Sequence, residues 1–205
     1  KYDYVCNCTV NKNNVKKNYK SNLDYDLKIA KKIKRKNKNF IFLSSRKVYK
    51  PRPFLNELSK LKPIDKDAQN KIKTENKLRK IFKSKLLILR ISNVVGLKTK
   101  KNLRNVHKTF FDNYLDIVKK NKTVIFYNQF KDFITINQLS KIFLLIINKN
   151  LTGIFNVSLG KKIYIREIIS WLNKHNKNKK NFIYINQNKN KFIKESFCLD
   201  NSKLT

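Results

Sequence analysis

The sequence predicts an α/β fold in which a doubly wound parallel sheet is joined to a small C-terminal lobe. Short apolar segments alternate with longer amphipathic segments through roughly the first hundred residues, as strands and helices do in such sheets. Leu86–Ile91 is apolar with little polar alternation, which is typical of a parallel strand covered on both faces. The two observations together favour a parallel sheet with helices on both sides.

Each expected element rests on a local pattern. Apolar residues in Leu23–Ile33 recur at the spacing of one helix face, among lysines. Phe40–Leu43 is a compact apolar run before a polar turn, and Pro51 and Pro53 mark the loop beyond it. The expected strands are Tyr4–Thr9, Phe40–Leu43, Leu86–Ile91, Val124–Phe126, Phe133–Ile136, Ile154–Val157 and Phe182–Ile185. The expected helices are Leu23–Ile33, about Asp67–Phe82, Val106–Val118, Leu139–Ile147 and Ile165–Asn173.

Polar residues follow several of the expected strands. They lie at Asn7–Val10, Ser44–Arg46 and Ser92–Gly96. Right-handed crossovers between parallel strands bring the carboxyl ends of the strands to one edge of the sheet, where ligands bind. These three segments are therefore the places to look for a site.

The net charge of +36 admits two interpretations. A strongly basic chain is typical of proteins that bind nucleic acids or anionic membranes. The lysines, however, are spread over the whole chain, and Asn, Ile, Phe and Tyr are abundant beside them, as an AT-rich coding sequence would produce. We favour the second interpretation and expect no specific nucleic-acid partner.

The remaining composition points to an ordinary cytoplasmic protein. Three cysteines, Cys6, Cys8 and Cys198, provide neither a disulfide framework nor a metal quartet, so we expect no metal site and a reducing compartment. The apolar runs are too short to span a bilayer, and we expect no membrane association.

A series of segments in chain order carries a resemblance to a known family. They are "YDYVCNC", "NLDYDLKIAKKI", "FIFLSSRKVY", "QNKIKTENKL", "LRISNVVG", "KDFITINQLSKIFLLII", "GIFNVSLG" and "FCLDNSKL". Together they resemble the extended short-chain dehydrogenase/reductase family, the NAD-dependent epimerases, dehydratases and reductases of nucleotide sugars. Each motif alone is weak, but their order over nearly the whole chain favours this fold and family.

The resemblance implies a partial Rossmann-like domain and a substrate-binding lobe. The first would comprise residues 1–100 and 137–158, and the second residues 101–136 and 159–205. The implied reaction is hydride transfer between NAD or NADP and a nucleotide-linked sugar, for surface polysaccharide. Expected partners are that substrate and, left open, a second copy of the chain.

The resemblance also implies roles for four residues in catalysis. Lys71 would hold the cofactor ribose and lower the pKa of a neighbouring proton donor, and Ser45 would hydrogen-bond the reacting sugar oxygen. Asn22 would hold a water or a backbone carbonyl behind the lysine. Asp67 stands where the family has its catalytic tyrosine. Two bland alternatives stay open, a surface lysine at 71 and a serine at 45 that caps its own backbone.

Further positions are implied for binding. Thr9 and Ser44, together with Lys71, would contact the cofactor. Ser45, Asn93 and Lys131 would contact the substrate; Lys131 replaces an arginine, which keeps a charge but loses the bidentate fork.

Two departures from the family pattern leave the activity of this chain open. Asp67 is shorter than tyrosine and ionised near pH 7, so we expect an ion pair with Lys71 one helical turn away. The first glycine is Gly96, so the glycine-rich turn that approaches a pyrophosphate does not precede it, and we expect a fragment of a longer protein. The alternatives are a catalytically weakened binding protein on the same fold and, less favoured, a basic nucleic-acid-binding protein.

Overall fold

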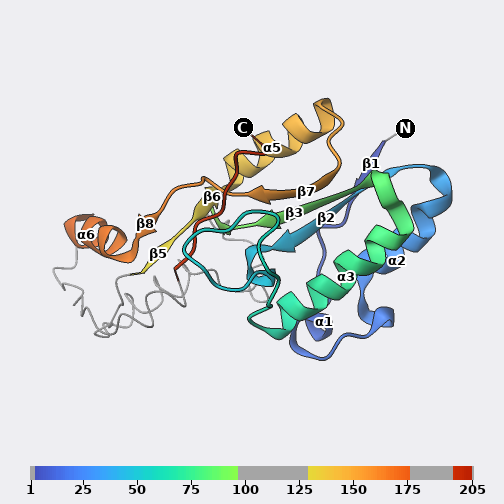
Figure 1. The fold of residues 1–205 in the computed structure, drawn as a ribbon, viewed down its shortest axis with the longest axis horizontal. Coiled ribbons are helices and arrows are strands. Elements are labelled where there is room, and N and C mark those ends of the chain that lie inside the picture. Colours follow the sequence, from blue (N-terminus) through green and yellow to red (C-terminus); the bar gives the residue numbers. More distant parts are fainter. Residues whose placement is uncertain (1–2, 97–128, 176–195, 205) are drawn as a thin grey trace.

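A parallel four-stranded sheet forms the centre of the fold (Figure 1). The computed structural model describes residues 3–96, 129–175 and 196–204. The strand order is β1-β2-β3-β7, and every neighbouring pair is parallel. These strands are β1 Tyr4–Cys6, β2 Asn39–Ser45, β3 Leu86–Ile91 and β7 Gly153–Val157. The doubly wound parallel sheet expected from the sequence is thus confirmed.

Helices cover both faces of this sheet. The described helices are α1 Lys12–Lys16, α2 Tyr25–Ile33, α3 Lys66–Phe82, α5 Ile136–Asn148 and α6 Ile165–His175, with short 3₁₀ turns η1 Ser21–Leu23, η2 Lys34–Lys36, η3 Arg46–Val48 and η4 Lys83–Lys85. Phe40 and Phe42 of β2 point to one face and pack against α2 and α3, whereas Ile41 points to the other face, where α5 lies. Side-chain alternation along the strands therefore produces two separate apolar cores.

Side-chain caps fix where the helices begin. Asp24 accepts a hydrogen bond from the backbone of Leu27 at the start of α2, and Asp65 accepts one from Ala68 at the start of α3. Thr135 and Gln138 form a reciprocal capping box before α5. Asp65 is therefore the cap of α3, and Asp67 lies in its first turn.

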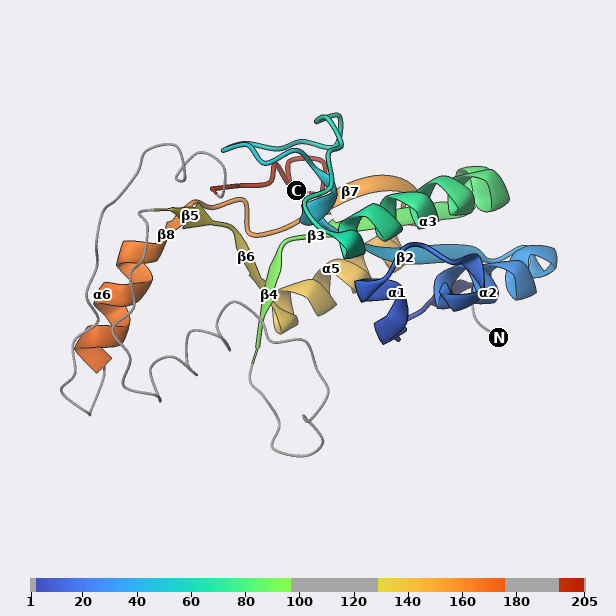
Figure 2. The same ribbon diagram turned by 90° about the horizontal axis from the view of Figure 1, so that it is seen from below.

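Three smaller pieces continue the chain beyond the main sheet. β4 Asn93–Val95 pairs with β6 Phe133–Thr135 in parallel, and β5 Phe130–Lys131 pairs with β8 Ile163–Tyr164 in antiparallel fashion. Figure 2 shows β5, β8 and α6 at the end of the molecule opposite α2. None of the helices in the described ranges combines the length and apolar character that a membrane span requires.

Several expected boundaries were wrong. The first strand ends at Cys6 instead of Thr9, because the Asn7 side chain bonds the backbone two residues on and turns the chain. The helix expected from Leu23 begins at Tyr25, after its Asp24 cap. The strand expected over Phe133–Ile136 ends at Thr135, because that residue caps α5.

Other expectations were confirmed, were missed, or lie outside the described residues. The strand Leu86–Ile91 has the expected bounds, and β2 extends two residues past the expected end. The sequence pattern did not predict α1, β4, β5 or β8. The expected elements Val106–Val118, Val124–Phe126 and Phe182–Ile185 lie outside the described residues.

Candidate functional site

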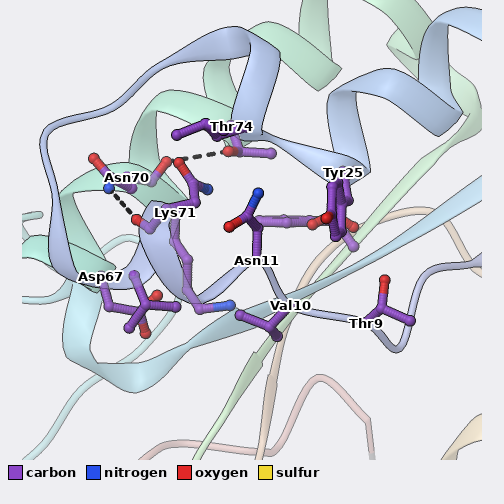
Figure 3. Close-up of a pocket in the computed structure, with 13 residues that line it drawn as sticks. Thr9, Val10, Asn11, Tyr25, Asp67, Asn70, Lys71 and Thr74 are labelled. Carbon is purple, nitrogen blue, oxygen red and sulfur yellow. Dashed lines mark hydrogen bonds between the residues drawn. The ribbon is translucent and has the colours of Figure 1, made fainter.

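A polar pocket lies at the carboxyl edge of the main sheet, beside the loop that follows β1 (Figure 3). The pocket and the open solvent space at its mouth together amount to about 380 Å³. Figure 3 shows Thr9 and Val10 from the strand-end loop on one side and Asp67 and Asn70 from α3 on the other. The complete lining is Thr9, Val10, Asn11, Asn14, Val15, Leu23, Tyr25, Asp26, Phe42, Asp67, Asn70, Lys71 and Thr74.

Lys71 is the cation of this pocket. It is half-buried on α3, and its Nζ donates a hydrogen bond to the carbonyl of Leu43 at 2.8 Å. The same Nζ lies 5.5 Å from the centroid of the Phe42 ring. Lys71 is thus not a freely exposed surface lysine. Its hydrogen bond joins α3 to Leu43 of β2, two residues before Ser45.

Asp67 lines the same pocket one turn earlier, yet the ion pair expected between Asp67 and Lys71 does not form. Within the described ranges, Asp67 has neither a hydrogen-bond partner nor an ion-pair partner, and the Lys71 ammonium donates to Leu43 instead. The i to i+4 spacing put both groups on one face, as expected, but the carbonyl at the strand end is the partner of the ammonium.

Asn7 shapes the strand-end loop. Its Oδ1 accepts hydrogen bonds from the Thr9 backbone N–H at 3.0 Å and from the Thr9 hydroxyl at 2.7 Å. Its Nδ2 donates to the carbonyl of Thr9 at 3.1 Å and to Oδ1 of Asp26 at 3.2 Å. One buried amide therefore fixes Thr9, a residue predicted to contact the cofactor, and joins the loop to the start of α2.

Asp26 is a second carboxylate of the pocket, and the sequence did not reveal it. Burial raises its pKa to about 6, while the Asn7 hydrogen bond and the Lys71 charge oppose that rise. In the sequence this residue resembles an ordinary acidic group in the first turn of a helix. Its place beside a lysine from another element depends on the tertiary fold, so no local signal could have found it.

The α1 segment forms the outer wall of the pocket. The amide of Asn70 donates hydrogen bonds to the carbonyls of Asn14 and Lys17, which holds this segment against α3. Oδ1 of Asn14 is buried and has no hydrogen-bond partner in the described part of the chain. A buried acceptor without a partner is unfavourable by roughly 1–3 kcal/mol, so a ligand donor in this lining would be favoured.

Ser44 belongs to a buried ionic network instead of the pocket. Its hydroxyl donates to Oε1 of Glu75 at 2.6 Å, and Oε2 of Glu75 lies 2.8 Å from Nη2 of Arg90. Both charged side chains are 1% exposed. Burial alone would lower the pKa of Arg90, but the Glu75 carboxylate raises it above its ordinary value. The expected cofactor contact of Ser44 is not supported by this placement, because its hydroxyl is already engaged.

Ser45 and Asn22 lie outside the pocket lining. Ser45 ends β2 and caps η3, and its Oγ accepts a weak hydrogen bond from the backbone of Lys47 at 3.3 Å, as in the bland alternative. It remains within two residues of Leu43, the Lys71 partner. Asn22 is exposed in η1, and its expected role stays a prediction. The backbone carbonyls of Asn14 and Lys17 accept hydrogen bonds from Asn70, which precedes Lys71 on α3.

Asn93 and Lys131 gather near a different strand end. The Asn93 amide donates to the carbonyl of Asp132 at 3.3 Å, and Lys131 is buried in β5 with its Nζ 5.8 Å from the Phe197 ring centroid. Asp132 itself is buried, accepts a hydrogen bond from the Leu199 backbone at 3.0 Å, and has its pKa raised by burial. Two residues predicted to bind substrate thus lie together, but outside the Lys71 pocket.

The described residues contain no group of three or more His, Cys, Asp and Glu side chains arranged to hold a metal ion. The pocket itself presents one ammonium, two carboxylates, and a rim of amides and hydroxyls. Such a set can bind hydroxyl-rich ligands and exchange a proton with them.

Comparison with known proteins identifies a family and several similar folds. A family model for the NAD dependent epimerase/dehydratase family matches residues 1–158. The fold is similar to UDP-N-acetylglucosamine 4-epimerase from Methanobrevibacter ruminantium M1, solved with UDP-N-acetylmuramic acid (TM-score 0.75, 22% identity, 98% of this chain and 69% of that chain). A search of curated proteins found no match.

Two further solved structures are similar. One is the Bordetella bronchiseptica enzyme WbmG in complex with NAD (TM-score 0.73, 17% identity, 98% of this chain and 64% of that chain). The other is the UDP-Glc/GlcNAc 4-epimerase of Campylobacter jejuni (TM-score 0.70, 20% identity, 87% of this chain and 61% of that chain). At these identities the structures show a shared fold, and the match extends over roughly two thirds of each longer protein.

Proposed function

Because this chain belongs to the NAD-dependent epimerase/dehydratase family, we propose that it binds a nucleotide-linked sugar and takes part in hydride transfer with NAD or NADP. The observation that carries the proposal is the position of Lys71. Its ammonium lies in a polar pocket at the carboxyl edge of a parallel sheet, where ligands bind in this class of fold. The similar solved structures include complexes with NAD and with a nucleotide sugar.

The pocket fits one end of a dinucleotide. Lys71, Thr9 and the buried Oδ1 of Asn14 offer donors and an acceptor to the hydroxyls of a ribose and to an amide. The turn after β1 contains no glycine, so the backbone there does not provide the close approach that a pyrophosphate needs. The residues of this chain therefore fit the ribose and nicotinamide end, and the cofactor when bound would supply the acceptor for the hydride.

The nucleotide of the substrate would lie toward β4 and β5, and its sugar would reach the nicotinamide end of the Lys71 pocket. Asn93 and Lys131 meet beside β4 and β5, and Ser45 at the end of β2 lies between that region and the Lys71 pocket along the sheet edge. We assign Lys71 and Thr9 to the cofactor and Ser45, Asn93 and Lys131 to the sugar nucleotide. The proposal has three further parts. They are a cytoplasmic location, a homodimer, and a division into a cofactor domain (1–100, 137–158) and a substrate lobe (101–136, 159–205).

A binding experiment on the native chain tests this function. Ligand-observed NMR should detect NAD⁺ with a dissociation constant of about 1 mM, because the turn after β1 contains no glycine for a close approach to the pyrophosphate. Lys71→Gln should weaken binding about tenfold, since it removes the charge but keeps a donor for Leu43. Lys73→Gln, an exposed position on the same helix, is the matched control and should stay within about twofold.

The same experiment with a uridine or thymidine diphosphate sugar completes the test. Loss of NAD⁺ affinity in Lys71→Gln but not in Lys73→Gln supports the assignment of the pocket to the cofactor. A native chain that binds neither NAD⁺ nor any nucleotide sugar at about 10 mM would contradict the proposed function.

Asp67 favours a second candidate function, a binding protein with weakened catalysis. A carboxylate without a partner in the described ranges occupies the position that resembles the tyrosine of the family. Under this candidate, Asp67→Tyr would create or strongly raise turnover of a nucleotide sugar, measured by the absorbance of NADH. A native chain that already turns over, and loses turnover in Asp67→Tyr, would rule this candidate out.

A further inference from the structure

We propose that Asp26 is the carboxylate that exchanges a proton with the substrate in the Lys71 pocket. This inference deepens the proposed function and rests on it. Asp26 and Asp67 both line the pocket, but they differ in their surroundings. Asp26 is half-buried, is hydrogen-bonded by Asn7, and feels the charge of Lys71, whereas Asp67 has no bonding partner in the described ranges.

The geometry around Asp26 gives it a fixed orientation. Asn7 donates to its Oδ1 at 3.2 Å, and the same Asn7 holds Thr9, so carboxylate and strand-end loop are positioned by one amide. A proton acceptor needs such a defined position, because proton transfer requires the acceptor within hydrogen-bond reach of the reacting group. Asp67 is attached to α3 without any such second contact.

The titratable groups that face Asp26 come from three elements. Asp24, the buried cap of α2, disfavours ionisation of Asp26, while Lys71 from α3 favours it. Cys6 at the end of β1 faces it as a thiol, because burial, Cys8 and Asp26 together raise the pKa of Cys6 to about 12. The balance, dominated by burial, leaves the pKa of Asp26 at about 6, so this group can both take up and release a proton near neutral pH.

The proposed step oxidises a hydroxyl-bearing carbon of the sugar to a carbonyl. The O–H bond of a sugar hydroxyl breaks, and its proton passes to a carboxylate oxygen of Asp26. The C–H bond on the same carbon breaks, and an oxidised nicotinamide, when bound, would supply the acceptor for its electron pair as hydride. The O–H electrons form the new C=O bond, and Asp26 returns the proton when the reaction runs in reverse.

Two measurements on the full chain test the inference. In the first, the ¹³Cγ resonance of Asp26 is followed from pH 3 to pH 9 without ligand, in the native chain and in Lys71→Gln. We expect a midpoint near pH 6 that moves upward in Lys71→Gln, because the opposing positive charge is lost. A midpoint at the ordinary value of 3.8, or one that Lys71→Gln does not move, would overturn the inference.

In the second measurement, NADH formation from a nucleotide sugar is compared between the native chain and Asp26→Asn. We expect kcat to fall about 100-fold with nucleotide affinity unchanged within about twofold, and the native rate to rise with pH through about pH 6. Asp3→Asn, at an exposed residue remote from the pocket, is the control for a lost carboxylate. Three results would each overturn the inference: full activity in Asp26→Asn, loss of activity in Asp67→Asn alone, or nucleotide binding without turnover in the native chain. A native chain that does not bind the nucleotide would contradict the proposed function as well.

Discussion

Glu75 and Asp67 are two carboxylates on α3, two helical turns apart, and their surroundings are opposite. Glu75 is 1% exposed and is engaged by Arg90 and Ser44. Asp67 lies in a pocket open to solvent and has no bonding partner in the described ranges. The first carboxylate joins α3 to two strands, and the second is left available. The turn of α3 around Glu75 therefore fixes the helix to the sheet, and the turn around Asp67 presents a carboxylate to the pocket.

The largest expected effect comes from removing the anchor. Glu75→Ala leaves the Arg90 guanidinium buried without its counter-charge, so we expect the free energy of unfolding to fall by about 3–5 kcal/mol, measured by urea denaturation. Asn76→Ala, at an exposed neighbour, should change it by less than about 0.5 kcal/mol. A loss below about 1 kcal/mol in Glu75→Ala would show that the anchor is not needed to hold α3.

The next effect concerns the pocket carboxylate Asp26. Its folded-state pKa of about 6 lies above the ordinary 3.8, so the folded state favours the protonated form, and this contribution to stability is lost as pH rises through about 6. We therefore expect Asp26→Asn to be more stable than the native chain by about 1–3 kcal/mol at pH 7.5. Thermal unfolding should show this advantage shrinking toward pH 4. An advantage that stays constant with pH would contradict the proposed burial of charge.

A smaller effect is expected at the start of α3. Asp65→Ala removes the cap on the Ala68 backbone and the 2.9 Å ion pair with Lys47, so we expect a loss of about 1 kcal/mol. Lys47→Met keeps the cap, and the half-exposed ion pair alone should contribute less than about 0.5 kcal/mol. The pKa of Asp65 is lowered because hydrogen bonds from Ala68 and Lys47 outweigh burial, so its contribution is present above about pH 4 and is lost in acid. Equal losses in both variants would assign the effect to the ion pair.

Sequence periodicity predicted the sheet well because an inner parallel strand such as Leu86–Ile91 is buried on both faces, which requires a nearly continuous apolar run. It failed where one side chain decides a boundary, as Asn7 does after β1 and Thr135 does before α5. Lys71 was predicted because its spacing to Glu75 resembles a family motif, and the structure places it in the polar pocket. Asp26 was not found, because its neighbours in space come from β1 and α3, and its local pattern is that of any acidic helix start.

The central claim is that the carboxyl edge of the sheet around Lys71 binds the nicotinamide cofactor. Mapping backbone amide shifts of the native chain during titration with NAD⁺ tests it most directly. The account predicts that the largest shifts fall on Thr9, Leu43 and Lys71, with little change at Asn37 and Lys85, which meet in turns at the other edge. Shifts concentrated at Asn37 and Lys85 would instead show general attraction of an anion to a basic surface, and would contradict the claim.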